Sequence, residues 1–88
     1  MDVNDRGKFL IEHPGWVLEE ETIRKTFEFT DFNEAMGFVV RVALLAEPAN
    51  HHPDIDIRWN KVTIALTTHS EGALTEKDIT LASKIEAL

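Results

Sequence analysis

The spacing of the apolar residues changes along this chain, and these changes restrict its fold more than any other feature. From 32 to 46 the apolar residues recur at intervals of three and four, the pattern of an amphipathic helix. From 55 to 66 they alternate with polar residues, the pattern of strands with one buried face. An earlier strand is predicted by residues that fall on one face: Ile23, Lys25, Phe27 and Phe29. A chain that switches between these periods is predicted to mix helices and antiparallel strands.

The segment 55–66 gives the clearest strand prediction. Its apolar residues share a face on either side of a tight turn near Asn60-Lys61, with Ile55, Ile57 and Trp59 before it and Val62, Ile64 and Leu66 after it. This arrangement predicts a β-hairpin. Because Trp59 shares a face with Ile55 and Ile57, we expect it to lie in the core, like Trp16.

Two helices are predicted with their ends. Asp31 and Glu34 resemble a capping box at the start of the first helix, and Pro48 is expected to end it. The apolar stripe of this helix consists of Phe32, Ala35, Met36, Val39, Val42, Ala43 and Ala46. Thr75 and Asp78 resemble the cap of a second helix, whose apolar side consists of Ile79, Leu81, Ala82, Ile85 and Leu88.

These elements predict an α+β fold. With a first strand from Trp16 that turns through 19–21, the order is β-β-α-β-β-α. A four-stranded antiparallel sheet with two main helices packed on one face is the simplest way to bury both helical stripes. All 88 residues are expected to form a single domain. Residues 1–14 are weakly patterned and are predicted to form a loosely ordered arm with one short helical turn.

The composition narrows the partners and the location. A domain of 10.0 kDa buries only roughly 60–65% of its unfolded surface, and with no cysteine it lacks disulfides, so we expect a homo-oligomer. The net charge of −7 argues against nucleic-acid binding and against an anionic membrane surface. No apolar run approaches the roughly 20 residues that span a bilayer, and no secretory signal is visible at the N-terminus. A cytoplasmic protein is expected.

Three histidines form the strongest candidate for a reactive site. His51 and His52 lie in the loop before the predicted hairpin, and His69 lies where the hairpin ends. Because the second strand of a hairpin returns alongside the first, all three imidazoles are expected at one edge of the sheet. Imidazole gives and takes protons near neutral pH, since its ordinary pKa is about 6.5. The pattern therefore predicts an acid–base site.

Other interpretations of the same residues stay open at this stage. Adjacent histidines before a proline are often solvated turn residues, and three histidines could bind Zn²⁺. Asp54 and Asp56 could orient an imidazole or simply be solvated. His13 precedes Pro14 in the unpatterned arm and is expected to be incidental.

The chain resembles the pterin-4a-carbinolamine dehydratases, and the resemblance covers nearly everything from residue 15 to 87. It is carried by an ordered series of residues: Gly15-Trp16, Phe27-Glu28-Phe29, Asp31-Phe32, Arg41-Val42-Ala43-Leu44, Ala46-Glu47, His51-His52-Pro53, Asn60-Lys61-Val62, Leu66, Thr68, His69, Leu74, Asp78-Ile79, Leu81-Ala82-Ser83 and Ile85-Glu86. A His-His-Pro motif alone would be weak, but the whole series is highly specific.

The resemblance implies a fold, an assembly and a reaction. The family has a four-stranded antiparallel sheet with helices on one face and assembles as dimers or dimers of dimers. Its members dehydrate 4a-hydroxytetrahydropterin to quinonoid dihydropterin, which regenerates the cofactor of aromatic amino-acid hydroxylases. Some members act in other pterin pathways, and an animal member binds a homeodomain transcription factor. No metal and no organic cofactor is implied for the reaction.

The resemblance also implies roles for particular residues. His52 is expected to be the principal acid–base group, and His51 and His69 are expected to bind substrate and share proton transfer. Glu47 is expected to hydrogen-bond the pterin or orient a histidine. The remaining residues expected to contact substrate are Asn50, Pro53, Thr67, Thr68 and Ser70.

Departures from the family pattern leave alternatives to catalysis. The family's longer first helix is expected to be absent or truncated, the first hairpin turn is tighter than in the animal relatives, and Gly72 is displaced by one position. None of these touches the three histidines. The rival hypotheses are a non-enzymatic dimerisation or regulatory module, a small metal-binding protein, and a pterin enzyme with another natural substrate.

Overall fold

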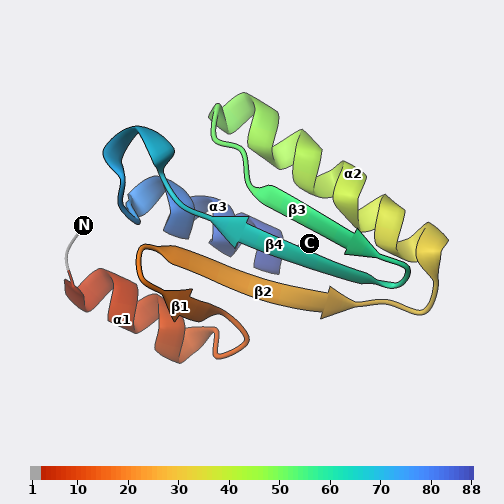
Figure 1. The fold of residues 1–88 in the computed structure, drawn as a ribbon, viewed down its shortest axis with the longest axis horizontal. Helices are drawn as coiled ribbons and strands as arrows, with labels where there is room; N and C mark the ends of the chain where they lie inside the picture. Colours follow the sequence, from red (N-terminus) through yellow and green to blue (C-terminus); the bar gives the residue numbers. More distant parts are fainter. Residues whose placement is uncertain (1–2) are drawn as a thin grey trace.

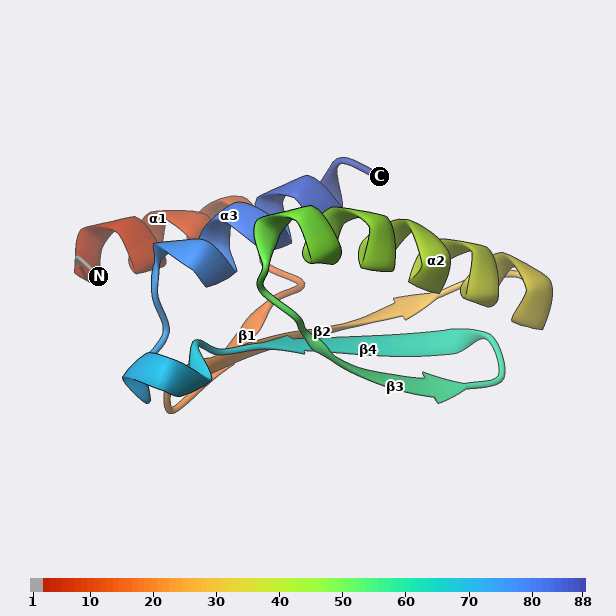
Figure 2. The same ribbon diagram turned by 90° about the horizontal axis from the view of Figure 1, so that it is seen from above.

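A four-stranded antiparallel sheet, in the order β1-β2-β4-β3, carries the three α-helices on one face (Figures 1 and 2). The structure is a computed structural model that describes residues 3–88. The strands are β1 (Val17–Glu19), β2 (Thr22–Glu28), β3 (Asp54–Arg58) and β4 (Lys61–Leu66). The helices are α1 (Val3–Glu12), α2 (Phe32–Ala49) and α3 (Glu76–Glu86), and a 3-10 helix, η1 (His69–Glu71), precedes α3. The predicted α+β class and antiparallel sheet are confirmed.

The N-terminal segment differs from its prediction. Residues 3–12 form the ten-residue helix α1, so the expectation of one short turn in a loosely ordered arm is wrong, and the first helix is not absent. Tertiary contacts explain the difference, because Phe9 is buried and lies 6.1 Å from the Trp16 ring, centroid to centroid. In addition, Arg6 forms an ion pair with Glu21 across the fold. Contacts of this kind stabilise a short helix that a sequence pattern does not reveal.

The core lies between the sheet and the helical layer. At the centre of the sheet, β2 pairs with β4, and Ile23 lies opposite Leu66. The buried residues of α2 are Ala35, Phe38, Val42 and Ala46, so its stripe was predicted in part. Phe32 was predicted inside but is 49% exposed, because it is the first residue of α2 at the far end of the helix. No helix within residues 3–88 is long and apolar enough to cross a membrane.

The second hairpin has the predicted pairing but a turn shifted by one residue. Ile55 lies opposite Ile64, and Ile57 lies opposite Val62. The turn consists of Trp59 and Asn60 rather than Asn60 and Lys61, and Trp59 has a positive φ of 52°. The predicted burial of Trp59 is therefore wrong, because Trp59 lies in the turn and is 67% exposed. Trp16 is buried, as predicted.

The helix ends largely follow the sequence. Asp31 accepts the Glu34 N–H at 2.8 Å, but the Glu34 carboxylate accepts the Thr30 N–H, so the box is shifted by one residue. Pro48 was expected to end α2, yet the helix continues to Ala49 and ends where Asn50 adopts a left-handed conformation. At α3, Thr75 and Asp78 form the predicted capping box.

Hydrogen bonds to a carboxylate of α3 join this helix to Trp16 and to β2. Glu86 of α3 accepts the indole N–H of Trp16 at 2.7 Å and the ammonium of Lys25 at 2.5 Å. Lys25 also lies 4.7 Å from the centroid of the Phe27 ring. These contacts explain how a lysine occupies the inner face of β2. Burial alone would raise the pKa of Glu86, but the hydrogen bonds from Lys25 and Trp16 outweigh it and lower this pKa.

This network predicts a pH-dependent stability. A lowered pKa means that the Glu86 carboxylate stabilises the fold above its ordinary value of 4.5, and that this contribution is lost as the pH falls through the folded pKa. We expect Glu86→Gln to lower the free energy of unfolding by about 1–2 kcal/mol at pH 7. The difference from wild type should shrink as the pH falls through the lowered pKa of Glu86, because the protonated carboxyl group and the amide are then both neutral. Urea unfolding at several pH values measures this. Glu12→Gln, which alters an exposed ion pair with Lys8, is the matched control. If Glu86→Gln and wild type differed in the free energy of unfolding by the same amount at all pH values, the pH-dependent role of Glu86 would be contradicted.

Candidate active site

The second hairpin brings the three predicted histidines to one end of the sheet. His51 and His52 precede β3, and His69 follows β4 within η1. Because Asp54 pairs with Ala65 in antiparallel register, the chain that enters β3 and the chain that leaves β4 meet at the same edge. The left-handed Asn50 turns the chain away from α2 immediately before His51.

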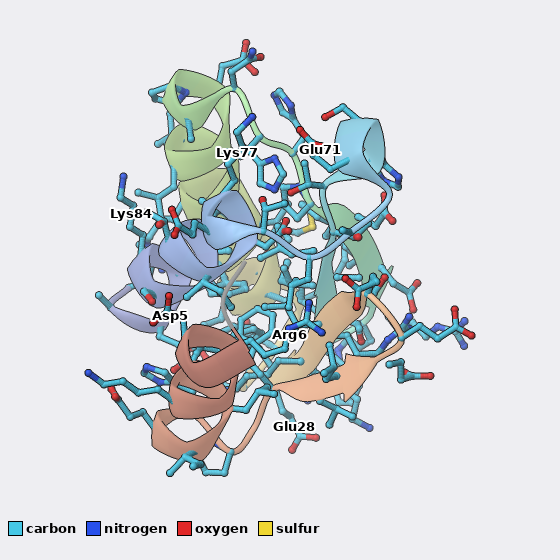
Figure 3. The ribbon with its side chains drawn as sticks, turned by 90° about the vertical axis from the view of Figure 1, so that its left-hand side faces the viewer. Asp5, Arg6, Glu28, Glu71, Lys77 and Lys84 are labelled. Atoms are coloured by element: carbon cyan, nitrogen blue, oxygen red, sulfur yellow. The ribbon has the colours of Figure 1, made fainter. Side chains whose placement is uncertain are left out.

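A hollow of about 330 Å³ lies at this edge. Most of the predicted site residues line it together: Asn50, His51, His52, Thr67, Thr68, His69 and Ser70. Two predicted residues, Glu47 and Pro53, are not among its lining, although Glu47 contacts it indirectly through His52. Lys77, which the sequence did not single out, also lines it, and Figure 3 shows Lys77 at the start of α3 on the side of the molecule that carries Glu71 and η1.

His51 is held by a buried carboxyl group. Its Nε2 hydrogen-bonds Oδ1 of Asp78, whose side chain is fully buried. The other oxygen of Asp78 accepts the hydroxyl of Thr68 at 2.8 Å and the backbone N–H of Thr75 at 2.9 Å. Asp78 therefore joins the start of α3, the end of β4 and the histidine loop. An imidazole oriented in this way presents its remaining nitrogen in a fixed direction.

His52 is held differently, by a carboxyl group at the surface. Its Nε2 lies 2.7 Å from Oε1 of Glu47, in the last turn of α2. The His52 side chain is 58% exposed, whereas that of His51 is only 11% exposed. His52 can therefore exchange protons with solvent, and Nδ1 of its ring stays available to a bound molecule.

His69 has a third kind of environment. It is exposed, and within residues 3–88 its imidazole makes no hydrogen bond. Its backbone carbonyl accepts the N–H of Gly72, which adopts the left-handed conformation with φ of 61° and closes η1. The position of His69 thus depends on the backbone of its loop.

Of the two carboxyl partners, Glu47 was expected to hydrogen-bond the pterin or orient a histidine, whereas the contact of Asp78 with His51 was missed. Asp78 was predicted only as a helix cap, and it both caps α3 and binds His51. Asp54 and Asp56 were considered as orienting groups, but Asp56 instead pairs with Arg58, and neither lines the hollow. The capping signal was the only sequence indication of Asp78, because its contact with His51 spans 27 positions.

The metal hypothesis has no support in this geometry. Among the described residues, 3–88, no three His, Asp or Glu side chains converge closely enough to hold a metal ion. The carboxyl partners of His51 and His52 approach different imidazoles, so they form two separate pairs.

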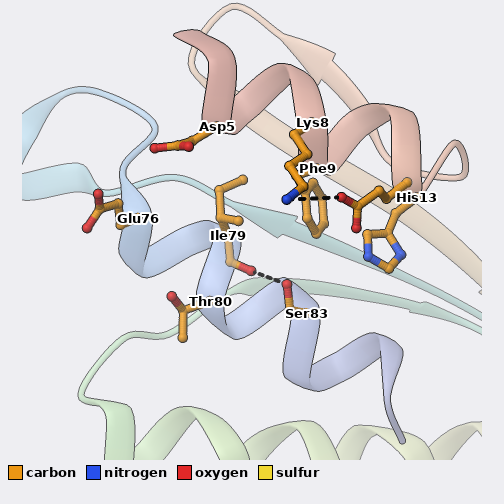
Figure 4. A pocket seen from close by; sticks show the side chains of 9 residues that line it. Asp5, Lys8, Phe9, His13, Glu76, Ile79, Thr80 and Ser83 are labelled. Carbon is orange, nitrogen blue, oxygen red and sulfur yellow. Dashed lines mark hydrogen bonds and ion pairs between the residues drawn. The ribbon is translucent and has the colours of Figure 1, made fainter. Parts of the chain in front are cut away.

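The fourth histidine lies at a different hollow. A cleft of about 340 Å³ between α1 and α3 is lined by His13, Phe9 and polar side chains (Figure 4). His13 lies over Phe9, with their ring centroids 4.8 Å apart. The lining mixes carboxylates, a lysine already paired with Glu12, and Ser83, which donates to a backbone carbonyl of its own helix. His13 is therefore placed apart from the other three histidines.

Comparisons with known proteins agree on one family. A sequence model described as Pterin 4 alpha carbinolamine dehydratase matches residues 1–88. A relative from Roseiflexus sp. (strain RS-1) is 57% identical over 74 residues, which are 84% of this chain and 80% of the relative. A relative from Prochlorococcus marinus (strain NATL2A) is 44% identical over 88 residues, 100% of this chain and 93% of the relative. Both carry the curated name "Putative pterin-4-alpha-carbinolamine dehydratase".

Solved structures show the same fold. A crystal structure from Brucella melitensis, described as a transcriptional coactivator/pterin dehydratase, has a TM-score of 0.89 and 38% identity, covering 99% of this chain and 95% of that one. A second structure, described as a pterin dehydratase-like protein and RuBisCO assembly factor in the alpha-carboxysome, has a TM-score of 0.70 and 24% identity, with 85% and 89% covered, and shares the fold alone. Because the family match spans residues 1–88 and the relatives cover at least 84% of the chain, this protein belongs to the pterin 4 alpha carbinolamine dehydratase family.

Proposed function

We propose that this chain dehydrates 4a-hydroxytetrahydropterin to quinonoid dihydropterin by histidine acid–base catalysis, in the recycling of a tetrahydropterin cofactor. Membership of the family supports the dehydration of a pterin carbinolamine. The single observation that carries the finer proposal is the hollow lined by His51, His52 and His69. Two of these imidazoles have carboxyl partners of their own.

The reaction needs only two proton transfers. A carbinolamine carries a hydroxyl group and an amine on the same carbon, and hydroxide is a poor leaving group. If the hydroxyl oxygen gains a proton while a ring N–H loses one, the C–O bond breaks, a C=N bond forms, and water leaves. No electrons are transferred to another molecule. Acid–base groups that operate near neutral pH are sufficient for this step, and each contributes typically 10²–10⁴-fold.

We assign His52 as the principal acid–base group. Its Nδ1 is available to substrate while Nε2 contacts Glu47, so the carboxyl group orients the ring. Its exposure allows the proton to be exchanged with solvent after each turnover. We assign His51, held by Asp78, and His69 to substrate binding and to a share of the proton transfer.

The substrate would be held largely by polar groups of the loops. Asn50, Thr67, Thr68 and Ser70 line the hollow and offer backbone and side-chain hydrogen bonds to a flat heterocycle. Lys77 adds a cation at the rim. Because the hollow is open at the surface, it can accept pterins that differ in their ring substituents.

A comparison of substrates tests this proposal. The protein is mixed with freshly generated 4a-hydroxytetrahydropterins that carry different side chains, and their dehydration is followed by ultraviolet absorbance. We expect faster dehydration than in buffer for all of them, with the highest kcat/KM identifying the natural side chain. Rates equal to those in buffer for every pterin, from folded protein, would refute the proposal.

The alternative is a non-enzymatic dimerisation or regulatory module of the same fold. Its motivation is the structural relative described as a RuBisCO assembly factor, a similarity that concerns the fold alone. The histidine hollow of this chain favours the enzyme, since a scaffold has no need of three imidazoles and two carboxyl partners at one edge.

We also propose that the protein is a homodimer or homotetramer. Leu44 and Val40 lie four residues apart on the outer side of α2 and are 69% and 56% exposed, and neighbouring exposed apolar side chains can mark an interface. A second copy of the chain would cover them. Light scattering should give a mass of twice or four times 10.0 kDa, and Leu44→Lys should lower it. A monomeric mass for wild type at micromolar concentration would contradict this.

A further inference from the structure

The loop that carries His69 is closed at its base. Residues 67–75 connect β4 to α3, and Thr68 and Ala73 exchange backbone hydrogen bonds of 3.1 and 3.4 Å. His69 lies inside this closed segment, and its imidazole has no hydrogen bond to the described part of the chain. The position of the imidazole relative to His51 and His52 therefore depends on what holds the two ends of the segment.

One residue of the first hairpin contacts both ends. Glu21 lies in the turn between β1 and β2, and its backbone carbonyl accepts the hydroxyl of Thr67 at 2.6 Å. Its carboxylate accepts the backbone N–H of Leu74 at 3.1 Å. These partners lie 46 and 53 positions away in the sequence. Glu21 thus joins the start and the end of the segment that carries His69.

Arg6 of α1 holds the Glu21 carboxylate in turn. Two guanidinium nitrogens of Arg6 donate to the two carboxylate oxygens at 3.0 and 3.1 Å, a bidentate arrangement. The hydrogen bond from Arg6, followed by that from the Leu74 N–H, lowers the pKa of Glu21, and the same contact raises the pKa of Arg6. Figure 3 shows Arg6 between α1 and the strands of the first hairpin. Neither Arg6 nor Glu21 lines the histidine hollow.

We propose that Glu21 is a positioning residue for His69, and that Arg6 and helix α1 serve the active site by fixing Glu21. This inference rests on the proposed dehydratase function of the same site. Asp78 holds segment 67–75 through hydrogen bonds with Thr68 and Thr75. Glu21 holds the same segment through hydrogen bonds with Thr67 and Leu74.

The expected effect is on catalysis more than on binding. A displacement of about 1 Å in a catalytic group can lower a rate by 10²-fold. His51 and His52 have other supports, in Asp78 and Glu47, so the rest of the hollow should still bind substrate without Glu21. We expect Glu21→Ala to lower kcat about tenfold, while KM stays within about threefold.

Two conservative variants separate the effect of the Leu74–Glu21 hydrogen bond from that of the Arg6–Glu21 ion pair. Glu21→Gln keeps an oxygen that can accept the Leu74 N–H but loses the charge, so it should restore most of the kcat lost in Glu21→Ala. Arg6→Lys keeps a positive charge but cannot form the bidentate pair of hydrogen bonds with the Glu21 carboxylate, and it should lower kcat by about twofold to threefold. Glu20→Ala removes the neighbouring carboxylate, which forms no ion pair or side-chain hydrogen bond with the described residues, and should leave kcat unchanged.

A second measurement does not depend on activity. In protein labelled with ¹³C-histidine, the ring resonance of His69 should shift or broaden in Glu21→Ala, while those of His51 and His52 stay in place. A role confined to stability would lower the unfolding midpoint and leave both kcat and the His69 resonance of the folded protein as in wild type. That result would overturn the inference. If Glu21→Ala does not fold, a wild-type kcat and His69 resonance in Arg6→Lys, which loses the bidentate contact to the Glu21 carboxylate, would overturn it equally.

The two proposals fail in different ways. If wild type has no dehydratase activity, the proposed function is wrong, and the His69 resonance alone then decides whether Glu21 positions this histidine. If wild type is active and Glu21→Ala matches it in kcat and spectrum, only the positioning role is wrong.

Discussion

His52→Ala is expected to lower the rate of 4a-hydroxytetrahydropterin dehydration by roughly 10²–10³-fold, as is typical for the loss of a general acid–base group. The residue lies in the loop between α2 and β3, and its side chain is more than half exposed. Its removal should therefore leave the fold and the unfolding midpoint unchanged. Glu47→Gln, which weakens the only hydrogen bond of this imidazole to the described residues, should give a smaller loss of kcat.

The fourth histidine provides a matched control. His13→Ala removes an imidazole from the α1–α3 cleft and should leave kcat within about twofold of wild type. Full activity in His52→Ala would refute the assignment of His52. A loss in His51→Ala or His69→Ala that greatly exceeds the loss in His52→Ala would transfer the principal role to that histidine.

The second large effect is expected at Asp78, on stability. Its fully buried carboxyl group binds the His51 imidazole, the Thr68 hydroxyl and the Thr75 N–H. Asp78→Ala leaves these buried groups without their partner, and each unsatisfied group costs about 1–3 kcal/mol. We expect the free energy of unfolding to fall by about 3–5 kcal/mol, a large share of the 5–15 kcal/mol of a typical domain. Urea unfolding followed by circular dichroism measures this loss.

Asp78→Asn separates the structural role from the chemical one. The amide has the same size, can accept the Thr75 N–H, and can still contact His51, so most of the stability should remain. The His51 ring, however, loses a carboxyl group as its hydrogen-bond partner and is oriented less firmly, and kcat should fall by about tenfold. Asp56→Asn, at an exposed carboxylate that pairs only with Arg58 among the described residues, is the control. A stability unchanged in Asp78→Ala would show that this buried network contributes little.

The local pattern predicted the elements that position the three histidines. Alternation over 55–66 determined the pairing of Ile55 with Ile64, and this pairing brings His51, His52 and His69 to one edge. The strands and the caps of α2 and α3 depend on neighbours in the sequence, which is why they could be predicted. The position of Trp59 could not, because a turn shifted by a single residue removes a side chain from the strand face.

The contacts that support the site join residues far apart in the sequence, so the local pattern could not predict them. Asp78 reaches His51 across 27 positions, and Arg6 reaches Glu21 across 15. Helix α1 was missed for the same reason, since its stabilising contacts are to Trp16 and Glu21 outside the helix. Such pairings follow only once the sheet order and the helical layer are in place.

The most direct test of the account is the rate at which purified protein dehydrates 4a-hydroxytetrahydropterin in the presence of EDTA, followed by ultraviolet absorbance. The three-histidine hollow predicts catalysis well above the rate in buffer, with full activity in the chelator. No catalysis from protein that is folded by circular dichroism would contradict the proposed function and favour the non-enzymatic dimerisation or regulatory module. Activity that disappears with EDTA and returns with Zn²⁺ would contradict the acid–base mechanism.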